Sequence, residues 1–590
     1  MRTTGFAAGA VALLLALGGC GTSTVDSSRS QSNTADTTPP AVAITSPSVA
    51  GNYSTTSAAV SLAGSAADNV GVASVAWHNA ANGAGGAASG TDSWSAPNIT
   101  LVSGVNTITV TAQDAAGNNT GATLVVTYNP GGSVSLTGNV DSSLINRSAA
   151  NAVYIYNGTV TPTGATPPVA TTPVTQDNGA CTFSYRFSAL PAGAYTVAFS
   201  SDATTFRGIS TVTLPGTGTH DFPPARRLQV GPTRALTVPS AAAAVALAGD
   251  VIEIDAGLYI DDIVVWRQSN LTLRGVGGRA HIHSTKIIPF VSGGTDQQNG
   301  KGIWVQAGST QNTTVENIEL SGASVADQNG AGIRADGSGL TVCNGYFHDN
   351  EDGILGGSGV VLVEYSEFDR NGFGDGQSHN MYFGQGVSLF TLRYSYSHRA
   401  KIGHNVKSRA QENRILYNRI TDEEGTASYE INLPNAGLSY VIGNLIQQGP
   451  NTDNSTIIEY GEEGVPAGWK TELYVVNNTI VNDLHSGRFI DIAAPGTTAR
   501  FVNNIFAGGG SIASGAGVTS TNNLATSPGF VDSANFDYHL TSASAARNAG
   551  VDPGSVGAFS LVPTSQYVQP ISREDRPVDG AIDIGAYEFQ

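Results

Sequence analysis

Short runs of alternating apolar and polar residues fill most of the chain, and clusters of turn residues separate them. AVAIT (41–45), AVSLAG (59–64) and NTITVTA (106–112) are such runs, and DNVG (68–71) and DAAGN (114–118) are such turns. A period of two over short segments predicts β-strands, and no long stretch repeats apolar residues with the helical period. The pattern therefore predicts an all-β protein of many short strands.

Two blocks of this pattern follow each other at 41–130 and 131–226, and each predicts a small β-sandwich. In the first block, PPAVAITSP, ADNVGVASVAW and NTITVTAQDAAGN resemble the immunoglobulin-like modules of bacterial surface proteins. In the second, FSALPAGAYTVAF resembles carboxypeptidase-regulatory or transthyretin-like modules. Neither block holds a cluster of His, Asp and Glu at catalytic spacing. We expect both to be spacers, with glycan binding as the alternative.

The third block, 227–590, repeats a short apolar strand and an Asn-containing turn roughly every 21 to 32 residues. VENIEL (315–320), VVNNTIVND (475–483) and FVNNIFAGG (501–509) are three copies. A repeat that cannot bury its own apolar face must stack on its neighbours, which gives a solenoid. Asn recurring at one turn predicts a ladder of stacked side-chain amides.

AGDVIEIDAGLY (248–259) resembles the cap and first coil of right-handed parallel β-helices of the pectate-lyase-like superfamily. The segment from about 525 onward resembles the closing segment of such proteins. The whole fold is therefore expected to be two small β-sandwich modules followed by a right-handed parallel β-helix.

The first twenty residues resemble a bacterial lipoprotein signal. Arg2 precedes a short apolar run, AAGAVALLLAL (7–17), which ends in LGGC with Cys20 as the residue to be lipidated. The run is too short to span a bilayer. Residues 21–40 contain almost nothing apolar and are expected to be a disordered linker. The resemblance implies an exported lipoprotein of the cell envelope, in the outer membrane or exposed on the surface, with Cys20 as its membrane contact.

Composition narrows the range of partners. Lys+Arg number 28 against 46 Asp+Glu, for a net charge of −18. Nucleic-acid-binding domains are usually basic, so we expect no nucleic-acid partner. Separately, we expect the protein to be a monomer. Cys181 and Cys343 lie far apart in different blocks and are expected to be isolated buried thiols rather than a disulfide.

Aligning the short strands of the third block by one apolar residue gives a buried column. Its members are Ile303, Ile333, Ile354, Met381, Val406, Ile431, Ile458 and Ile490. Neighbouring positions then point outward. The outward column after the apolar residue is Trp304, Arg334, Leu355, Tyr382, Lys407, Asn432, Glu459 and Asp491, and the column before it contains Asn380, Asn405 and Glu430.

These columns gather bases and amides on one strip of an acidic chain, which suits an anionic polymer. Breaking a uronide by elimination requires a base for the C5 proton, a group that neutralises the carboxylate, and an acid for the leaving oxygen. Lys407 is the candidate base, because a neighbouring Arg409 lowers the pKa of an amine, and Tyr382 is a candidate acid or base. The further candidates are His404 for catalysis, and Asn380, Asn405, Glu430, Asn432, Arg334 and His379 for substrate binding.

Two resemblances bear on the reaction. HNVKSRAQENRILYNRI (404–420) resembles the lysine coil of chondroitinase-B-like and alginate lyases, which implies a base role for Lys407. The calcium acids and the second-coil arginine of those lyases have no counterpart here. The same stretch resembles mannuronan C5-epimerases, which implies roles for His404, Ser408 and Arg409, with DGQSHN (375–380) as a loose echo of their preceding motif.

Several alternatives stay open. His379 and His404 also suit a stacked structural pair, and Glu430 with Glu459 suits calcium, the one cofactor that the residues indicate. Asn451-Thr452-Asp453 echoes polygalacturonases, but no paired Asp motif follows. The sequence favours a lyase acting on an anionic, uronic-acid-containing polysaccharide. The alternatives are a polyuronate C5-epimerase and a non-catalytic glycan-binding or adhesin-type surface protein.

Overall fold

The computed structural model describes residues 36–128, 134–147, 149–177, 181–289, 300–484, 486–577 and 579–590. The predicted signal peptide with Cys20, and nearly all of the predicted linker, lie outside these residues. No helix within the described ranges is long and apolar enough to cross a membrane. The chain separates into two compact units, Met1–Gly132 and Ser133–Gln590.

The first unit is a β-sandwich, as its alternating pattern predicted. One sheet has the order β1-β3-β6 and the other β2-β8-β7-β4-β5. The strands are β1 (Ala41–Ser46), β2 (Asn52–Thr55), β3 (Ala59–Ala67), β4 (Val72–Asn79), β5 (Ala84–Ala87), β6 (Ser93–Thr100), β7 (Gly104–Asp114) and β8 (Asn119–Tyr128). Alternate residues of β7, including Ile108, Val110 and Ala112, are fully buried, so the period of two fills the core between the sheets.

The second unit begins with another pair of antiparallel sheets, ordered β12-β13-β9 and β11-β10-β14-β15. These strands are β9 (Val134–Val140), β10 (Ala152–Asn157), β11 (Ala170–Pro173), β12 (Thr175–Gln176), β13 (Phe183–Leu190), β14 (Gly193–Ser200) and β15 (Arg207–Leu214). Their inner faces meet in an aromatic core that contains Tyr185, Phe187 and Phe199. This is the second predicted sandwich.

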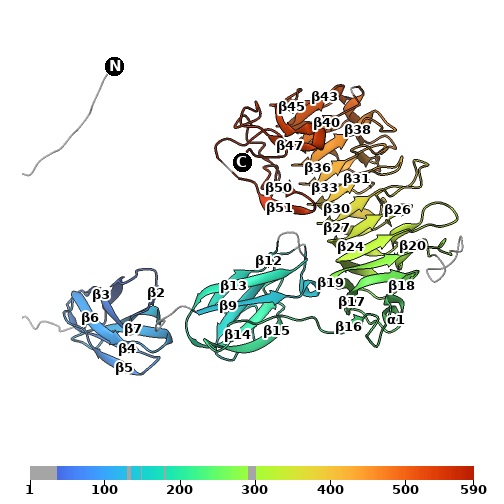
Figure 1. Cartoon of the computed structure of the whole chain (residues 1–590). Coiled ribbons are helices and arrows are strands. Elements are labelled where there is room, and N and C mark those ends of the chain that lie inside the picture. Colours follow the sequence, from blue (N-terminus) through green and yellow to red (C-terminus); the bar gives the residue numbers. More distant parts are fainter. Residues whose placement is uncertain are drawn as a thin grey trace, which may run out of the picture. The chain divides into compact units, whose positions relative to one another are not determined.

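The remainder of the second unit is a right-handed parallel β-helix (Figure 1). It opens with β16 (Arg227–Val230), the short helix α1 (Pro239–Ala243), β17 (Val251–Ile260) and β19 (Thr272–His283). One face is a ten-stranded parallel sheet of one short strand per coil. Its strands are β18 (Val264–Trp266), β20 (Gly302–Gln306), β23 (Ala331–Ala335), β26 (Asp352–Gly356), β29 (Met381–Phe383), β32 (Val406–Ser408), β35 (Ile431–Leu433), β38 (Thr456–Tyr460), β41 (Arg488–Ile492) and β44 (Ser511–Ser514).

The other face is a twenty-stranded sheet to which most coils contribute two strands with a turn between them. After β19 these pairs are β21 (Gln311–Glu316) and β22 (Ile318–Ser321), β24 (Ser338–Cys343) and β25 (Tyr346–His348), β27 (Gly359–Glu364) and β28 (Glu367–Asp369), β30 (Val387–Arg393) and β31 (Tyr396–His398), β33 (Glu412–Leu416) and β34 (Arg419–Thr421), β36 (Gly437–Ile442) and β37 (Leu445–Gln448), β39 (Thr471–Val476) and β40 (Thr479–Asn482), β42 (Thr498–Val502) and β43 (Ile505–Gly508), and finally β45 (Val518–Thr521) alone.

The predicted amide ladder runs along the turn between these paired strands. Its members are Asn418, Asn444, Asn478, Asn504 and Asn523, and the Nδ2 of each of the first four donates to the Oδ1 of the Asn in the next coil at 2.9–3.0 Å. The residue before each ladder Asn takes a left-handed conformation, as at Tyr417 (φ 58°) and Asn477 (φ 49°). That bend turns the following amide inward, where it stacks on its neighbour. The repeated Asn is therefore a structural feature of the solenoid.

The C-terminal segment packs along the side of the β-helix, where the red trace meets the yellow strands in Figure 1. It contains β46 (Phe530–Asp532), β47 (Asp537–Leu540), β48 (Ser555–Val556), β49 (Phe559–Ser560), β50 (Ser565–Val568) and β51 (Ser572–Asp575). Phe559 stacks on Tyr440 with ring centroids 4.1 Å apart. The backbone N–H of Thr564 donates to the hydroxyl of Tyr417 at 3.1 Å. The segment thus covers apolar side chains of the twenty-stranded sheet.

The prediction of two isolated thiols was wrong. Cys181 and Cys343 form a disulfide, with their Cα atoms 5.9 Å apart. They are 162 residues apart, but the second sandwich packs against the early coils, so the two residues meet in space. Arg274 of β19 donates to Asp141 at 3.0 and 3.1 Å across the same junction. Sandwich and β-helix are therefore joined by a covalent bond and by buried charge.

Candidate functional site on the ten-stranded sheet

The outward column of the ten-stranded sheet lies largely as its apolar pattern predicted. Tyr382 pairs in register with Lys407, Lys407 with Asn432, and Asn432 with Glu459. Arg334 and Leu355 precede them, and Asp491 follows Glu459. Neighbouring strands lie about 4.8 Å apart, so these side chains form a continuous row.

One coil is out of register with the prediction. Trp304 pairs with Ile333, a member of the buried column, and is only 1% exposed. Its indole ring packs edge-on against Trp266 in the core. The predicted outward position of Trp304 is therefore wrong, because β20 places five consecutive buried residues in a row and its apolar pattern fits either alignment.

Lys407, Tyr382 and Arg409 form one compact cluster. The Nζ of Lys407 lies 5.2 Å from the centroid of the Tyr382 ring. The Nε of Arg409 donates to the Tyr382 hydroxyl at 2.8 Å. The side chains of Lys407 and Arg409 are only 13% and 17% exposed. Two cations and a phenol thus share a partly desolvated patch on the outer face of β29 and β32.

Burial and the adjacent Arg409 guanidinium lower the pKa of Lys407 from its ordinary value, although acids around it oppose the shift. The lowered pKa increases the fraction of neutral amine at a given pH. A neutral amine can accept a proton, whereas the ammonium form cannot. The sequence predicted a lowered pKa for Lys407 from the neighbouring Arg409. In the structure, Arg409 is the smaller of two causes of the lowered pKa, and desolvation is the larger.

An acidic loop, 461–464, lies against this cluster. Glu463 forms an ion pair with Arg409, and its carboxylate is 3.9 Å from the Nζ of Lys407. Arg409 also donates to the Oδ1 of Asn435 at 3.1 Å. Asn435 follows Pro434 in a turn, and nothing in its sequence context indicated a role at the site. Glu463 lies in the acidic segment GEEG (461–464), and its contacts with the two cations were not predicted from the sequence.

The next two positions of the column are covered by the same loop. Asn432 is fully buried and donates to Glu459 at 2.9 Å and to Glu462 at 3.0 Å. Burial, followed by the charge of Glu462, raises the pKa of Glu459 to about 9, so this carboxyl is protonated at neutral pH. Asn432, predicted to bind substrate, therefore lies in the row but beneath the loop.

The prediction that Asn380, Asn405 and Glu430 face outward was wrong. All three are fully buried and form an internal ladder. Asn380 donates to Asn405 at 2.8 Å, and Asn405 donates to the Oε2 of Glu430 at 2.6 Å. These residues stand just before β29, β32 and β35, in the bend that enters each strand, where the strand period of two does not apply. They are parts of the solenoid interior and cannot reach a polymer on the surface.

His379 and His404 form a stacked structural pair, which is one of the two roles that the sequence left open for them. Their ring centroids are 4.4 Å apart, and the Nδ1 of His379 accepts the backbone N–H of His404 at 3.0 Å. His404 in turn accepts the N–H of Tyr429 at 3.3 Å. Burial lowers the pKa of both, to about 3 for His404. Both rings are therefore neutral and link successive coils.

The remaining predicted residues do not join the cluster. Arg334 donates to Asp336 at 2.7 Å and is separated from Tyr382 by the coil of Leu355. Glu430 faces the interior and Glu459 the outside, so the predicted calcium pair does not converge. Among the described residues, the groups of three or more acids or histidines close enough to hold a metal ion contain neither of them.

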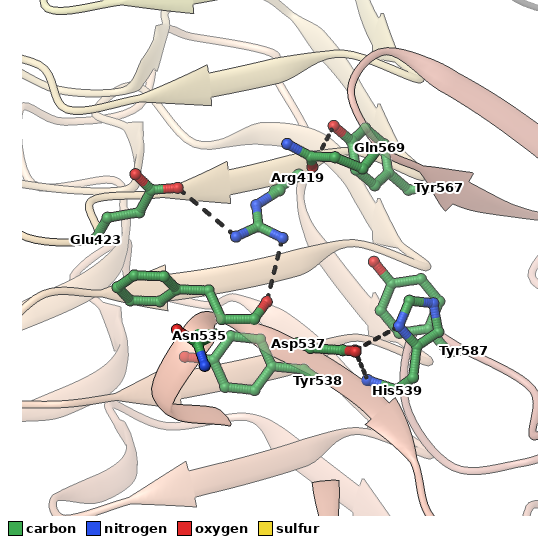
Figure 2. A pocket seen from close by; sticks show the side chains of 10 residues that line it. Arg419, Glu423, Asn535, Asp537, Tyr538, His539, Tyr567, Gln569 and Tyr587 are labelled. Atoms are coloured by element: carbon green, nitrogen blue, oxygen red, sulfur yellow. Dashed lines mark hydrogen bonds and ion pairs between the residues drawn. The ribbon is translucent and has the colours of Figure 1, made fainter. Parts of the chain in front are cut away.

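A separate pocket of about 440 Å³ lies between β34 and the C-terminal segment (Figure 2). Tyr538, Tyr567 and Tyr587 line it, and Arg419 donates across it to the backbone oxygen of Phe536 at 3.2 Å. Asp537 pairs with His539 at its edge. None of the predicted site residues lies in this pocket, which belongs to the packing of the C-terminal segment on the sheet.

Comparisons with known proteins give structural neighbours only. No family model matches the chain, and no curated protein matches it in sequence. Among solved structures it is similar to a pectate lyase, at 15% identity over 62% of this chain and 97% of that one, with a TM-score of 0.39. It is similar to a PL6 family polysaccharide lyase from Pseudopedobacter saltans, at 12% identity over 56% and 100%, with a TM-score of 0.25. A pectin methylesterase from Aspergillus niger matches at 11% identity over 56% and 93%, with a TM-score of 0.24.

Proposed function

We propose that the chain cleaves an anionic, uronic-acid-containing polysaccharide by β-elimination on the outer face of the ten-stranded sheet. The observation that carries the proposal is the Lys407–Tyr382–Arg409 cluster, in which a lysine of lowered pKa lies beside a phenol and a guanidinium. A cluster of this kind in a surface row, with a perturbed base, is typical of catalytic sites.

Each group has a role in the reaction. Arg409 neutralises the substrate carboxylate, which acidifies the C5 proton, and the neutral amine of Lys407 takes that proton. The electron pair forms the C4–C5 double bond while the bond from C4 to the glycosidic oxygen breaks. Tyr382 accepts a hydrogen bond from Arg409, so its own O–H is available to donate a proton to the leaving oxygen.

In this proposal, the substrate carboxylate binds where the carboxylate of Glu463 lies. It lies against both Arg409 and Lys407, the two cations that an acidic sugar would contact. A uronate entering the site displaces Glu463 and takes over its ion pairs. The same contact is compatible with the second candidate function, a non-catalytic glycan-binding protein. Arg409 and Lys407 could bind the carboxylate of an acidic glycan without reacting with it.

The test is incubation with alginate, pectate and glycosaminoglycans, followed by ultraviolet absorbance of the unsaturated uronide and NMR of the polymer. The expected result is unsaturated product with one polymer, and a loss of about 100-fold or more in Lys407→Ala. Lys470→Ala, which removes a 60% exposed lysine, is the matched control and should retain activity.

The other outcomes distinguish the alternatives. Inversion at C5 without chain cleavage identifies a polyuronate C5-epimerase, which shares the proton abstraction and returns the proton to the other face. Binding to one polymer without either product identifies a glycan-binding surface protein. Equal product from Lys407→Ala and wild type would remove Lys407 from the mechanism.

The proposed location is the cell envelope, through a lipid on Cys20. The disulfide Cys181–Cys343 supports export, because disulfides persist in oxidising compartments outside the cytosol. Expression of Cys20→Ser tests the anchor, since the variant should move from the membrane fraction to the soluble fraction. Wild-type protein that is already soluble would contradict the proposal.

A further inference from the structure

Two histidines and a glutamate meet on the outer side of the twenty-stranded sheet, away from the candidate site. His281 of β19 pairs in register with Glu319 of β22. His348 of β25 lies on the next coil, two residues beyond the partner of Glu319. Residues two apart on neighbouring strands share one face of a sheet. The fold therefore brings three potential metal ligands from three coils together.

The distances between them fit a metal ion. The Nδ1 of His281 and the Nε2 of His348 are each 3.2 Å from the Oε1 of Glu319. One ligand atom from each residue lies within 4.8 Å of the others. Zn²⁺ binds imidazole and carboxylate at about 2.0–2.1 Å, so neighbouring ligands of a tetrahedral site are about 3.3–3.4 Å apart. The two contacts to Glu319 are close to that edge length.

The other nitrogen of each ring is held by a hydrogen-bond partner. The Nε2 of His281 is 2.7 Å from the hydroxyl of Ser321, and the Nδ1 of His348 is 2.9 Å from the carboxylate of Asp349. Such partners fix the ring orientation and the tautomer of a metal-binding histidine. Both rings are thus oriented with one nitrogen toward Glu319, which a simple His–Glu ion pair does not require.

The cluster is partly open to solvent, and its carboxylate contacts the two imidazoles. The side chains of His281, Glu319 and His348 are 27%, 23% and 18% exposed, so an ion and a water can reach them. Arg279 is the nearby guanidinium, and it donates to the backbone and side-chain oxygens of Asn344. The side-chain contacts of Glu319 are thus with the two imidazoles that would share the metal ion with it.

We propose that His281, Glu319 and His348 bind a divalent transition metal ion, with Zn²⁺ as the best fit, and leave its fourth coordination position to water or a ligand. Two imidazoles and one carboxylate suit zinc or iron rather than calcium, which prefers oxygen ligands. This site is independent of the proposed elimination, because it uses other residues on another sheet.

The experiment is a titration of the full, chelator-treated chain with Zn²⁺ by calorimetry, and with Co²⁺ by visible absorption. The expected result is one equivalent of Zn²⁺ and intense tetrahedral Co²⁺ bands. His281→Ala and His348→Ala should each weaken binding by about 100-fold or more, and Asp349→Asn by about 10-fold, since loss of an outer-shell partner typically weakens binding 10- to 100-fold. His539→Ala, which removes a 53% exposed histidine paired with Asp537, is the matched control.

Circular dichroism of each variant establishes that the fold is retained. Zn²⁺ affinity and Co²⁺ spectra that are unchanged in both histidine variants would overturn the proposal, as would wild-type protein that takes up no Zn²⁺. Loss of metal binding with the polysaccharide activity retained would support this site and leave the proposed function untouched.

Discussion

Two columns of residues run along the same coils of the ten-stranded sheet, two positions apart. They share the spacing of the coils but differ in burial and in hydrogen-bond partners. Asn380 and Asn405 belong to the inner column, where each amide is used in a buried ladder. Tyr382 and Lys407 belong to the outer column and take their partners from Arg409 and a distant loop. The inner pair repeats from coil to coil because the solenoid needs it. The outer pair changes, and that change is where we locate the chemistry.

The largest expected difference between the two columns is in the free energy of unfolding, which a substitution in the inner column should lower most. Asn405→Ala removes the partner of the buried Glu430 carboxyl and of the Asn380 amide. Each unsatisfied buried polar group costs about 1–3 kcal/mol, so we expect a loss of about 3 kcal/mol or more in the free energy of unfolding. Urea denaturation measures it.

Lys407→Ala is the matched variant from the outer column. It should change the free energy of unfolding by less than about 1 kcal/mol, because Lys407 lies on the outer face of the sheet and its ion-pair partner, Glu463, is 39% exposed and stays solvated without it. If both variants lost the same stability, the division into a structural and a functional column would be wrong.

The second effect is the loss of stability at low pH that the stacked histidines His379 and His404 cause. Burial lowers the pKa of His404 to about 3 in the folded protein. In the unfolded chain the pKa of a histidine is about 6.5. The stabilising contribution is therefore present above about pH 6.5 and is lost as the pH falls toward 3, because only the unfolded state takes up the proton. One proton corresponds to about 1.4 kcal/mol per pH unit, or about 2 kcal/mol at pH 5.

His404→Gln removes that titration. The variant should lose less stability than wild type between about pH 7 and pH 5, measured by urea denaturation at each pH. Equal pH dependence in the two proteins would show that this ring is protonated in the folded state, and would reopen a role for it in proton transfer.

The outer column was predictable because its register depends on buried apolar residues. Val406 and Ile431 must point inward, and a slip by one residue would expose them, so Lys407 and Asn432 have to face outward. The same rule fails at Trp304, where five buried residues in a row leave the register undetermined. It fails again at Asn405, which stands in a bend where strand periodicity does not hold.

Contacts between distant segments were not predictable from local pattern. Nothing in the residues around Cys181 and Cys343 encodes a pairing across 162 positions, because the pairing depends on how the sandwich packs against the coils. Glu463, the ion-pair partner of Arg409, comes from a loop more than one coil away, so this contact was not predictable for the same reason. Local pattern thus predicted the scaffold and the position of Lys407, whereas the ion pairs around it required the three-dimensional structure.

The smallest expected effect tests whether Glu463 occupies the place of a substrate carboxylate. Its charge raises the pKa of Lys407 against the lowering by burial and Arg409. Glu463→Gln should therefore shift the rise of kcat/KM with pH to lower pH, because the amine loses its proton more readily. It should also lower KM for an acidic oligosaccharide a few-fold, about 3-fold to 10-fold, since the substrate no longer competes with a carboxylate that is 39% exposed. Glu424→Gln, which removes one charge from the other acidic loop, 421–425, controls for net charge. A Glu463→Gln variant with a higher KM would mean that Glu463 positions the cations for the substrate rather than standing in its place.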